Sequence, residues 1–558
     1  MFQSKVYNRT IALTCAMLAI LAITTACVGK EDQTTNSSSA KKGSLSATVY
    51  DRGLIPASEG TMEKNRWTKW INESGPANVT FVAVPRTESK QKLNTLFASG
   101  SAPDLIFEFE PSIKNPLYDQ KQLMPIDDMI NNYSTVYKKL IEENPALKQA
   151  SIKSDGKMYE FGKLNEAIPQ NIAVIRQDWL EKLNLTAPQT TEELYQVAKA
   201  FAENDPDGNG KKDTYGLNIG AGLSDVFGGG SLNNSYVDVN GELVRQWDNH
   251  RYHTEFVKQL FDEGIIDKDF ITDNNGAKAR QDFLNGKTGI YFTQANTSLW
   301  SRLWVADYAT LKANVPGAEL AILAYPKSPL GQYINWINNP VQMTAVVNRS
   351  AKDPKAIMEY IDFLSTPDTG RTLTSGLEGV HWNNGAGGCP NAIDPEKNKT
   401  ETGYLGQDYN MVFSVPEGGK CFFIAGTFNV EKPEEKLAKD MFKANLDIFY
   451  DLIDQQASWP GLTHSEHLPS VPQELLVDLQ NAGTEIPNIF KSAMVSGSSY
   501  TVEQAMADAQ ATWDKYNGKK IDEFYQTWYS ENKDTILMPV DIFSIVNDQK
   551  KLQEDILK

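Results

Sequence analysis

The chain has 558 residues, of which 41% are hydrophobic and 10% aromatic, and its formal net charge is −17. This composition is typical of a folded globular protein and excludes a disordered or fibrous one. The length predicts two or more lobes with sizeable cores. Because nucleic-acid binding depends on cationic contacts to phosphates, we expect no nucleic-acid partner for so acidic a chain.

The N-terminus has the pattern of an export signal. Lys5 and Arg9 precede an uncharged run at 11–23, which is shorter than the roughly 20 apolar residues that span a bilayer. The run leads to Cys27, and a small residue before a cysteine resembles a bacterial lipobox, in which the cysteine is acylated. Thr24 stands where a lipobox usually has leucine, so cleavage of an ordinary signal peptide remains the alternative.

Processing at Cys27 would make residues 1–26 a lipoprotein signal peptide and leave lipid as the only contact with the membrane. Residues 27–44 are small, polar and charged, so we expect a flexible tether there. One acyl chain binds a bilayer only marginally, and a stable anchor needs more than one. The expected location is the extracellular face of the bacterial cell membrane.

The first part of the mature chain has the pattern of an α/β fold. Predicted strands at 46–50, 79–84 and 104–109 alternate with helix-like segments at 61–73 and 88–98. Strands that alternate with helices are the signature of a parallel sheet covered by helices. We therefore predict an α/β fold class.

Later elements are marked by their first residues. Residues 172–175 form a further apolar strand, and Thr190 with Glu193 has the spacing of a capping box before a helix. Asp353 and Thr501 mark two more helix starts. The last hundred residues have a mainly helical pattern.

A calcium-binding loop is predicted at 205–213. Oxygen-bearing side chains occupy relative positions 1, 3, 5 and 9, with Gly210 at position 6, as in an EF-hand loop. Position 12 is Gly216 instead of a bidentate glutamate, so Thr214 or water would complete the shell. The alternative is a surface turn rich in Asp, Asn and Gly. The expected ligands of a structural calcium ion are the side chains of Asp205, Asp207, Asn209 and Asp213 and the backbone carbonyl of Lys211.

Several tryptophans lie in loop-like surroundings rich in Asn, Gly or Pro. Indole faces suit the apolar faces of sugar rings, whereas core packing is the alternative for each ring. The net charge argues mildly against strongly anionic oligosaccharides, although a local arginine such as Arg176 or Arg302 would override it. The candidate ligand-binding tryptophans are Trp300, Trp336, Trp382 and Trp459.

Catalytic sequence motifs are missing. The sequence has no G-x-S-x-G elbow, no G-x-x-x-x-G-K-[ST] phosphate loop and no H-E-x-x-H pair. A glycosidase pair of carboxylates is a spatial arrangement that a sequence does not reveal. We therefore expect no enzyme, and an exported carbohydrate-active enzyme remains the alternative.

The cysteines predict one disulfide. Cys15 leaves with the signal and Cys27 is the acylation candidate, so Cys389 and Cys421 remain. Outside the cytoplasm, two remaining cysteines most often form a disulfide. In the loop-entropy model, this bond would close a loop of about 30 residues and contribute about 3–4 kcal/mol. Two separate buried thiols are the alternative.

Several segments together resemble the family 1 extracellular solute-binding proteins of ABC transporters. The resemblance is to their large lipoprotein branch, which includes LipO-like proteins and alginate-oligosaccharide binders. The most specific feature is the DPDGNGK–DTYG stretch that follows DWLEKL. The segments that carry the resemblance are 97–107 (FASGSAPDLIF), 174–185 (VIRQDWLEKLNL), 188–216, 283–292 (FLNGKTGIYF) and 353–382.

The resemblance implies a periplasmic-binding-protein-like (type II) clamshell, with two α/β lobes, a hinge and extra C-terminal helices. By this analogy, the N-lobe comprises 45–165 plus 285–335, and the C-lobe comprises 166–284 plus 336–445. Residues 446–558 then form a helical segment that packs on both lobes.

The same resemblance implies a monomer that captures a carbohydrate, expected to be an oligosaccharide, in the cleft between the lobes. The cargo is delivered unaltered to the permease subunits of an ABC transporter. A peptide-binding transport component of the same fold is the alternative.

The resemblance also supports individual site residues. In the alginate-binding relatives the loop equivalent to 205–213 holds calcium. The Gly376-x-Glu378-Gly379-x-x-Trp382 segment resembles a family turn near the cleft, so Glu378 and Trp382 join the ligand candidates with Arg176. A turn-stabilising carboxylate is the alternative role for Glu378.

Overall fold

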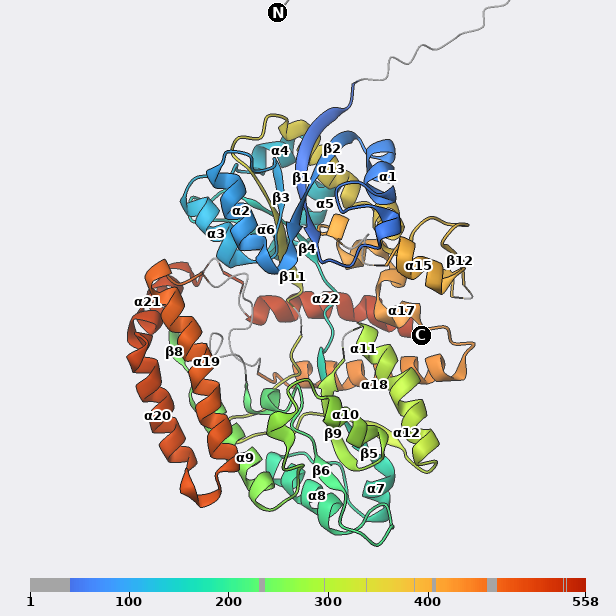
Figure 1. Cartoon of the computed structure of the whole chain (residues 1–558), viewed down its shortest axis with the longest axis vertical. Coiled ribbons are helices and arrows are strands. Elements are labelled where there is room, and N and C mark those ends of the chain that lie inside the picture. The colour runs from blue at the N-terminus through green and yellow to red at the C-terminus, as the bar shows by residue number, and fades with distance from the viewer. Residues whose placement is uncertain are drawn as a thin grey trace, which may run out of the picture. The chain divides into compact units, whose positions relative to one another are not determined.

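The computed structural model contains a folded body from Lys42 to Lys558 (Figure 1). Cys27, most of the expected tether, and Trp459 lie outside the residues that the structure describes. Gly43 and Ser44, expected in the tether, already belong to the first strand. The described residues are 41–229, 236–295, 297–337, 339–385, 387–403, 408–458, 469–534, 536–537 and 539–558.

The first lobe is built on a five-stranded sheet with the order β2-β1-β3-β11-β4. Strand β1 runs parallel to β2 and β3, which confirms the parallel arrangement expected from the sequence. Strand β11 runs antiparallel to both β3 and β4. The strands are β1 (Gly43–Asp51), β2 (Ala77–Pro85), β3 (Leu105–Phe107), β4 (Glu160–Leu164) and β11 (Val341–Val347).

Alternating hydrophobicity explains how this sheet packs. In β2, the buried Val79 and Phe81 alternate with the exposed Asn78 and Thr80, so one face joins the core. Figure 1 shows helices around the sheet. They are α1 (Arg66–Ser74), α2 (Ser89–Ala98), α3 (Pro111–Asp119), α4 (Asp127–Tyr133), α5 (Val136–Glu143), α6 (Pro145–Ser151), α13 (Pro354–Leu364), α14 (Pro367–Ser375) and α15 (Pro395–Glu401).

The second lobe is built on a four-stranded sheet with the order β10-β5-β9-β6. Strand β5 (Asn171–Arg176) is buried throughout and pairs antiparallel with β9 (Thr288–Gln294) and β10 (Leu320–Leu323), whereas β6 (Tyr215–Leu217) is parallel to β9. The surrounding helices are α7 (Gln177–Lys182), α8 (Thr191–Glu203), α9 (Asp248–Asp262), α10 (Ala277–Leu284), α11 (Thr297–Ser301), a π-helix (Arg302–Asp307), α12 (Tyr308–Asn314) and α18 (Pro433–Asp454).

The lobe boundaries expected by analogy are wrong for 285–335 and for the first part of 336–445, whereas α18, which begins at Pro433, packs on the C-lobe as expected. Strands β9 and β10 lie within 285–335 but pair with β5 and β6, so this segment belongs to the C-lobe. Conversely, β11 and α13 lie within 336–445 but pack on the N-lobe sheet. Pairing between distant strands, and not local pattern, decides which sheet each segment completes.

Small elements complete the body. Two antiparallel hairpins pair β7 with β8 and β12 with β13. Within the described ranges, no helix is both long enough and apolar enough to cross a membrane. The remaining strands and α-helices of the described ranges are β7 (Tyr236–Val239), β8 (Glu242–Arg245), β12 (Trp382–Asn384), β13 (Pro390–Ala392), α17 (Ile424–Thr427), α19 (Gln473–Val495), α20 (Val502–Lys515), α21 (Gly518–Asn532) and α22 (Pro539–Leu557).

The C-terminal helices contact elements of both lobes. Helix α19 packs against α9 of the C-lobe, and α22 packs against α17 and α18. In the N-lobe, the Gln149 amide donates to the carbonyl of Ile536, just before α22. The helix start predicted at Thr501 is confirmed, and it forms a capping box in which Thr501 and Gln504 accept each other's backbone N–H groups.

Candidate functional site

A polar cluster lies where the chain first passes from the N-lobe sheet to the C-lobe sheet. The amide of Asn171, the first residue of β5, donates to the buried carboxylate of Asp225 at 2.8 Å. The backbone N–H of Gln170 donates to the carbonyl of Trp336 at 2.8 Å. Burial raises the pKa of Asp225 to about 6. The half-buried Trp336 therefore lies beside the passage between the lobes.

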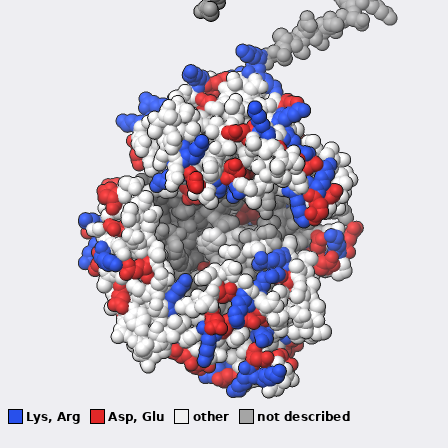
Figure 2. All heavy atoms as spheres, viewed as in Figure 1, with Lys and Arg blue, Asp and Glu red and all other residues white. Residues whose placement is uncertain are grey.

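A pocket of about 750 Å³ lies in the C-lobe along β6 and β9. Its lining combines aromatic side chains with amides, acids and two arginines, which is the mixture expected for a polar ligand. Figure 2 shows a hollow on one face of the body, with acidic and basic side chains interspersed around it. The pocket lining includes Tyr215, Asn218, Phe270, Asn274, Arg280 and Arg302.

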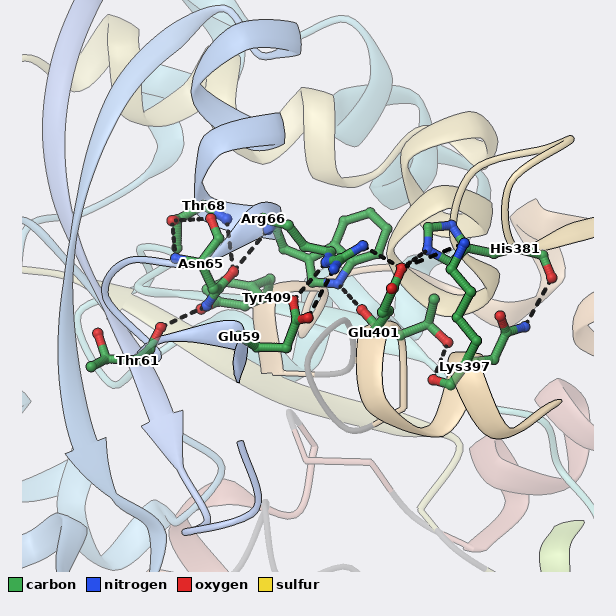
Figure 3. Close-up of polar contacts among 12 residues, drawn as sticks. Glu59, Thr61, Asn65, Arg66, Thr68, His381, Lys397, Glu401 and Tyr409 are labelled. Atoms are coloured by element: carbon green, nitrogen blue, oxygen red, sulfur yellow. Dashed lines mark hydrogen bonds and ion pairs between the residues drawn. The ribbon is translucent and has the colours of Figure 1, made fainter. Parts of the chain in front are cut away.

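The Gly376–Trp382 turn is anchored to helix α1 by a charged network (Figure 3). The Nδ1 atom of buried His381 accepts the backbone N–H of Leu377 at 2.9 Å, so Nε2 carries the proton that faces Glu401 at 3.1 Å. Arg66 pairs with both Glu401 and Glu59. This network fixes the turn and leaves Glu378, at its tip, exposed.

Three of the predicted ligand-binding residues are buried in the protein interior instead. Trp300 is 0% exposed and donates its indole N–H to the carbonyl of Ala438. Trp382 is 6% exposed and donates to the carbonyl of Gly376. Arg176 is 1% exposed and pairs with Asp178. These three expectations are corrected, because packing and internal hydrogen bonds already use the groups that a ligand would contact.

The predicted calcium loop brings two carboxylates together around the amide nitrogen of Asn209, whose oxygen accepts the backbone N–H of Lys211. The Asn209 amide donates to Asp207 at 2.7 Å and to Asp213 at 3.0 Å, so both carboxylates face one point. The carboxylate of Asp205 accepts the N–H groups of Asn209 and Gly210. Within the described chain, no three His, Cys, Asp or Glu side chains are arranged to hold a metal by themselves. An amide oxygen and a backbone carbonyl would therefore have to contribute.

Of the two groups expected to complete the calcium shell, Thr214 or water, Thr214 is engaged elsewhere. Its buried hydroxyl donates to the carbonyl of Phe201 at 2.8 Å and so faces helix α8. Burial and the neighbouring carboxylates raise the pKa of Asp207. The remaining donors are all oxygen atoms, which suits a hard cation such as calcium and not zinc.

Cys389 and Cys421 are joined by a disulfide, with their Cα atoms 5.3 Å apart. The bond ties the β12–β13 hairpin to the segment before α17. Lys420, beside Cys421, donates to the carbonyl of Gly387 in the same hairpin. The β12–β13 hairpin is thus held at its base by the His381–Glu401 contact and at its loop by the disulfide and Lys420.

Comparison with known proteins finds bacterial relatives of this chain. The chain is 28% identical over 340 residues to the polygalacturonan/rhamnogalacturonan-binding protein YtcQ of Bacillus subtilis, covering 58% of this chain. It is 29% identical over 352 residues to lipoprotein LipO of the same organism, covering 60% of this chain. It is 30% identical over 230 residues to the fructooligosaccharide ABC transporter substrate-binding protein FusA of Streptococcus pneumoniae, covering 37%. In these alignments the chain spans 64% of YtcQ, 65% of LipO and 42% of FusA.

Solved structures share the fold. The alginate-binding protein AlgQ2, solved without calcium ion, has a TM-score of 0.57 at 20% identity and covers 88% of this chain and 98% of its own. An EF-hand mutant of FusA with fructo-nystose has a TM-score of 0.56 at 20% identity and covers 88% and 99%. The sequence model of the bacterial extracellular solute-binding proteins matches residues 70–371. Because this match covers more than half of the chain, the protein belongs to the bacterial extracellular solute-binding protein family.

Proposed function

We propose that this protein captures an oligosaccharide between its two lobes and delivers it, chemically unaltered, to the permease of an ABC transporter. Its family supports a binding role. Both YtcQ and FusA are named for binding saccharide polymers or oligomers, which supports a carbohydrate cargo. An aromatic and polar pocket on the C-lobe is consistent with such a ligand.

The observation that carries this proposal is the connection between two separate sheets. The chain leaves the N-lobe sheet at Leu164 and enters the C-lobe sheet at Asn171, and it returns between Leu323 and Val341. Two lobes joined by a few extended segments can close around a ligand by rotation at those segments. Ligand that contacts both lobes would favour the closed form, and the permease would recognise that form.

Anchoring at Cys27 completes the proposal. Lipid on this cysteine would hold the protein at the extracellular face of the membrane, and the tether would give it reach. LipO, a relative over 60% of this chain, is named a lipoprotein. Metabolic labelling with a palmitate analogue tests this directly, because a Cys27→Ser chain should lose the label and appear in the medium.

The binding proposal is tested with the secreted chain lacking residues 1–27. Melting temperature and isothermal titration against neutral and acidic oligosaccharides should show stabilisation without any change in the saccharide. Release of shorter products would support a carbohydrate-active enzyme instead. Stabilisation by peptides and by no saccharide would support the peptide-binding alternative.

Calcium is proposed as a structural ion of the 205–213 loop. The expected ligands are Asp205, Asp207, Asn209, Asp213 and the carbonyl of Lys211, with water in place of Thr214.

A chelator should lower the melting temperature of the wild-type protein. Asp207→Ala should lower the melting temperature and abolish the chelator's effect. Asp269→Ala, a change of an exposed acid in another loop, should leave the chelator's effect intact. Equal melting curves with calcium and with chelator would disprove the site.

A further inference from the structure

The C-lobe pocket runs along two parallel strands, from their first residues, Tyr215 and Thr288, to their carboxyl ends. Strands β6 and β9 run parallel, and the pocket gathers residues that directly follow them, such as Asn218 after β6 and Gln294 at the end of β9. Gln294 pairs with Asn171, the residue at which the chain enters the C-lobe. Ligands of open α/β sheets bind at the carboxyl ends of parallel strands. The end of this pocket near Gln294 therefore adjoins the chain segment that connects the two lobes.

Two arginines of the pocket lining, Arg280 and Arg302, share the buried carboxylate of Asp307. Arg280 binds Asp307 with two nitrogens, Nε at 3.0 Å and Nη2. The nearest approach of Arg302 to Asp307 is 3.7 Å. Asp307 is 3% exposed, whereas the side chain of Arg302 is 44% exposed. Because Arg280 already occupies both oxygens of Asp307, Arg302 keeps N–H donors available to a ligand.

The local helix geometry creates this arrangement. Arg302–Asp307 forms a π-helix, in which residues five apart lie on the same side. Arg302 and Asp307 are five apart, so the π-turn brings them together on the pocket wall. Single π-turns of this kind are found frequently at functional sites.

The acids elsewhere in the pocket do not compete for Arg302, because they have closer partners. Asp267 and Asp282 both pair with Lys278, at 2.6 Å and 2.8 Å. Asp273 accepts the backbone N–H groups of Lys278 and Ala279. Of the two arginines in the pocket lining, Arg302 is the less engaged, because its ion pair with Asp307 is long at 3.7 Å whereas Arg280 binds Asp307 through two hydrogen bonds.

We propose that this pocket binds an acidic saccharide and that Arg302 receives the carboxylate of a uronate unit. The inference rests on the proposed carbohydrate-binding function and narrows its cargo to carboxylate-bearing oligosaccharides. Guanidinium and carboxylate form paired, charge-assisted hydrogen bonds. The Arg280–Asp307 ion pair lies behind Arg302. Arg302 is then the residue that makes the pocket prefer a negatively charged saccharide to a neutral one.

Isothermal titration with trigalacturonate and its fully methyl-esterified form tests the proposal, because the two probes share a skeleton and differ in charge. The wild-type protein should bind the acid about tenfold or more tightly than the ester, and added salt should weaken only the acid's binding. Arg302→Gln should remove the preference while keeping ester binding, and Arg302→Lys should retain part of it. Arg349→Gln removes an exposed arginine whose side chain donates to the Lys121 carbonyl, and it should change neither the preference for the acid nor the binding of the ester.

The outcomes separate this inference from the function beneath it. Equal binding of acid and ester by the wild type, or an unchanged preference in Arg302→Gln, would overturn the inference. Binding of neutral oligosaccharides with none of trigalacturonate would overturn the inference alone. No binding of any saccharide would overturn the proposed function as well. Melting curves without ligand show whether Arg302→Gln is folded, and the salt dependence of the wild type gives a test that needs no variant.

Discussion

The side-chain oxygen of Gln549, in α22, accepts the backbone N–H of Ala167 at 2.9 Å. The amide nitrogen of the same glutamine donates to the carbonyl of Asn165 at 2.9 Å. Residues 165–167 belong to the first passage between the two sheets, and Gln549 is 5% exposed. One buried side chain near the C-terminus therefore satisfies the backbone of the segment about which the lobes would rotate.

Gln549→Leu should destabilise the protein by about 1–3 kcal/mol, because two backbone groups lose their partner in a buried setting. Urea unfolding followed by tryptophan fluorescence measures the loss. Gln480→Leu, an exposed change in α19, is the matched control and should change stability by less than about 0.5 kcal/mol. Equal stability of both variants would show that water replaces Gln549 without cost.

Glu166 should make the unfolding free energy fall as pH rises toward 9. Burial raises the pKa of Glu166 to about 8, while the N–H of Ile424 and the amide of Gln553 oppose the shift. A raised folded-state pKa means that the stability from protonated Glu166 is complete below about pH 4.5 and is lost as pH rises through 8.

Glu166→Gln should therefore be more stable than wild type at pH 9, by several kcal/mol, and similar to it at pH 5. Melting temperatures across pH 5–9 measure the difference. Glu142→Gln, in an exposed part of α5, should follow the wild-type curve. A wild-type curve that is flat between pH 6 and 9 would contradict the assignment.

Glu160→Gln should cost about 3–5 kcal/mol, since it leaves the buried ammonium of Lys114 without its counter-ion. Burial alone would raise the pKa of Glu160, but Lys114 at 2.6 Å and Lys153 at 2.5 Å lower it to about 2. Its contribution to stability is present above about pH 4.5 and is lost as pH falls toward 2. Chemical unfolding at pH 7 and pH 3 measures both effects. Asp440→Asn, in an exposed pair with Lys436, should cost less than about 1 kcal/mol.

Removal of the disulfide by Cys389→Ser with Cys421→Ser should lower stability by about 3–4 kcal/mol, because the unfolded chain loses a cross-link between residues 32 apart. Chemical unfolding with and without reductant measures this. The wild-type protein should respond to reductant and the double variant should not. A reductant-insensitive wild type would mean that its two thiols are not bonded.

Local signals in the sequence predicted local structure well. The Asp353 side chain caps α13 through the N–H of Ala356, and Thr501 caps α20 in a capping box, as their spacing indicates. Thr190 likewise accepts the N–H of Glu193, but Glu193 reaches back to Gln189 and not to Thr190. A cap needs only neighbours in sequence, which is why the sequence reveals it.

Side-chain burial depends on partners that are distant in the sequence, so the sequence did not predict which of the candidate ligand residues would be buried. Trp300 is covered by α18, whose Ala438 carbonyl lies 138 positions further along the chain. Arg176 is held by Asp178 nearby and also by the carbonyl of Gly286, 110 positions away. The sequence indicated Arg302 only as a local positive charge. Arg302 lines the pocket because it lies in a π-helix, which no local motif predicts.

Strand β11 is the bridge that joins β4 to the rest of the N-lobe sheet. Strand β11 follows β10 along the chain. All four strands of the C-lobe sheet are therefore synthesised before the N-lobe sheet can be completed. An N-terminal fragment that stops before Val341 would carry an unfinished sheet with open edges. Products truncated before Val341 would therefore be prone to aggregate through these edges.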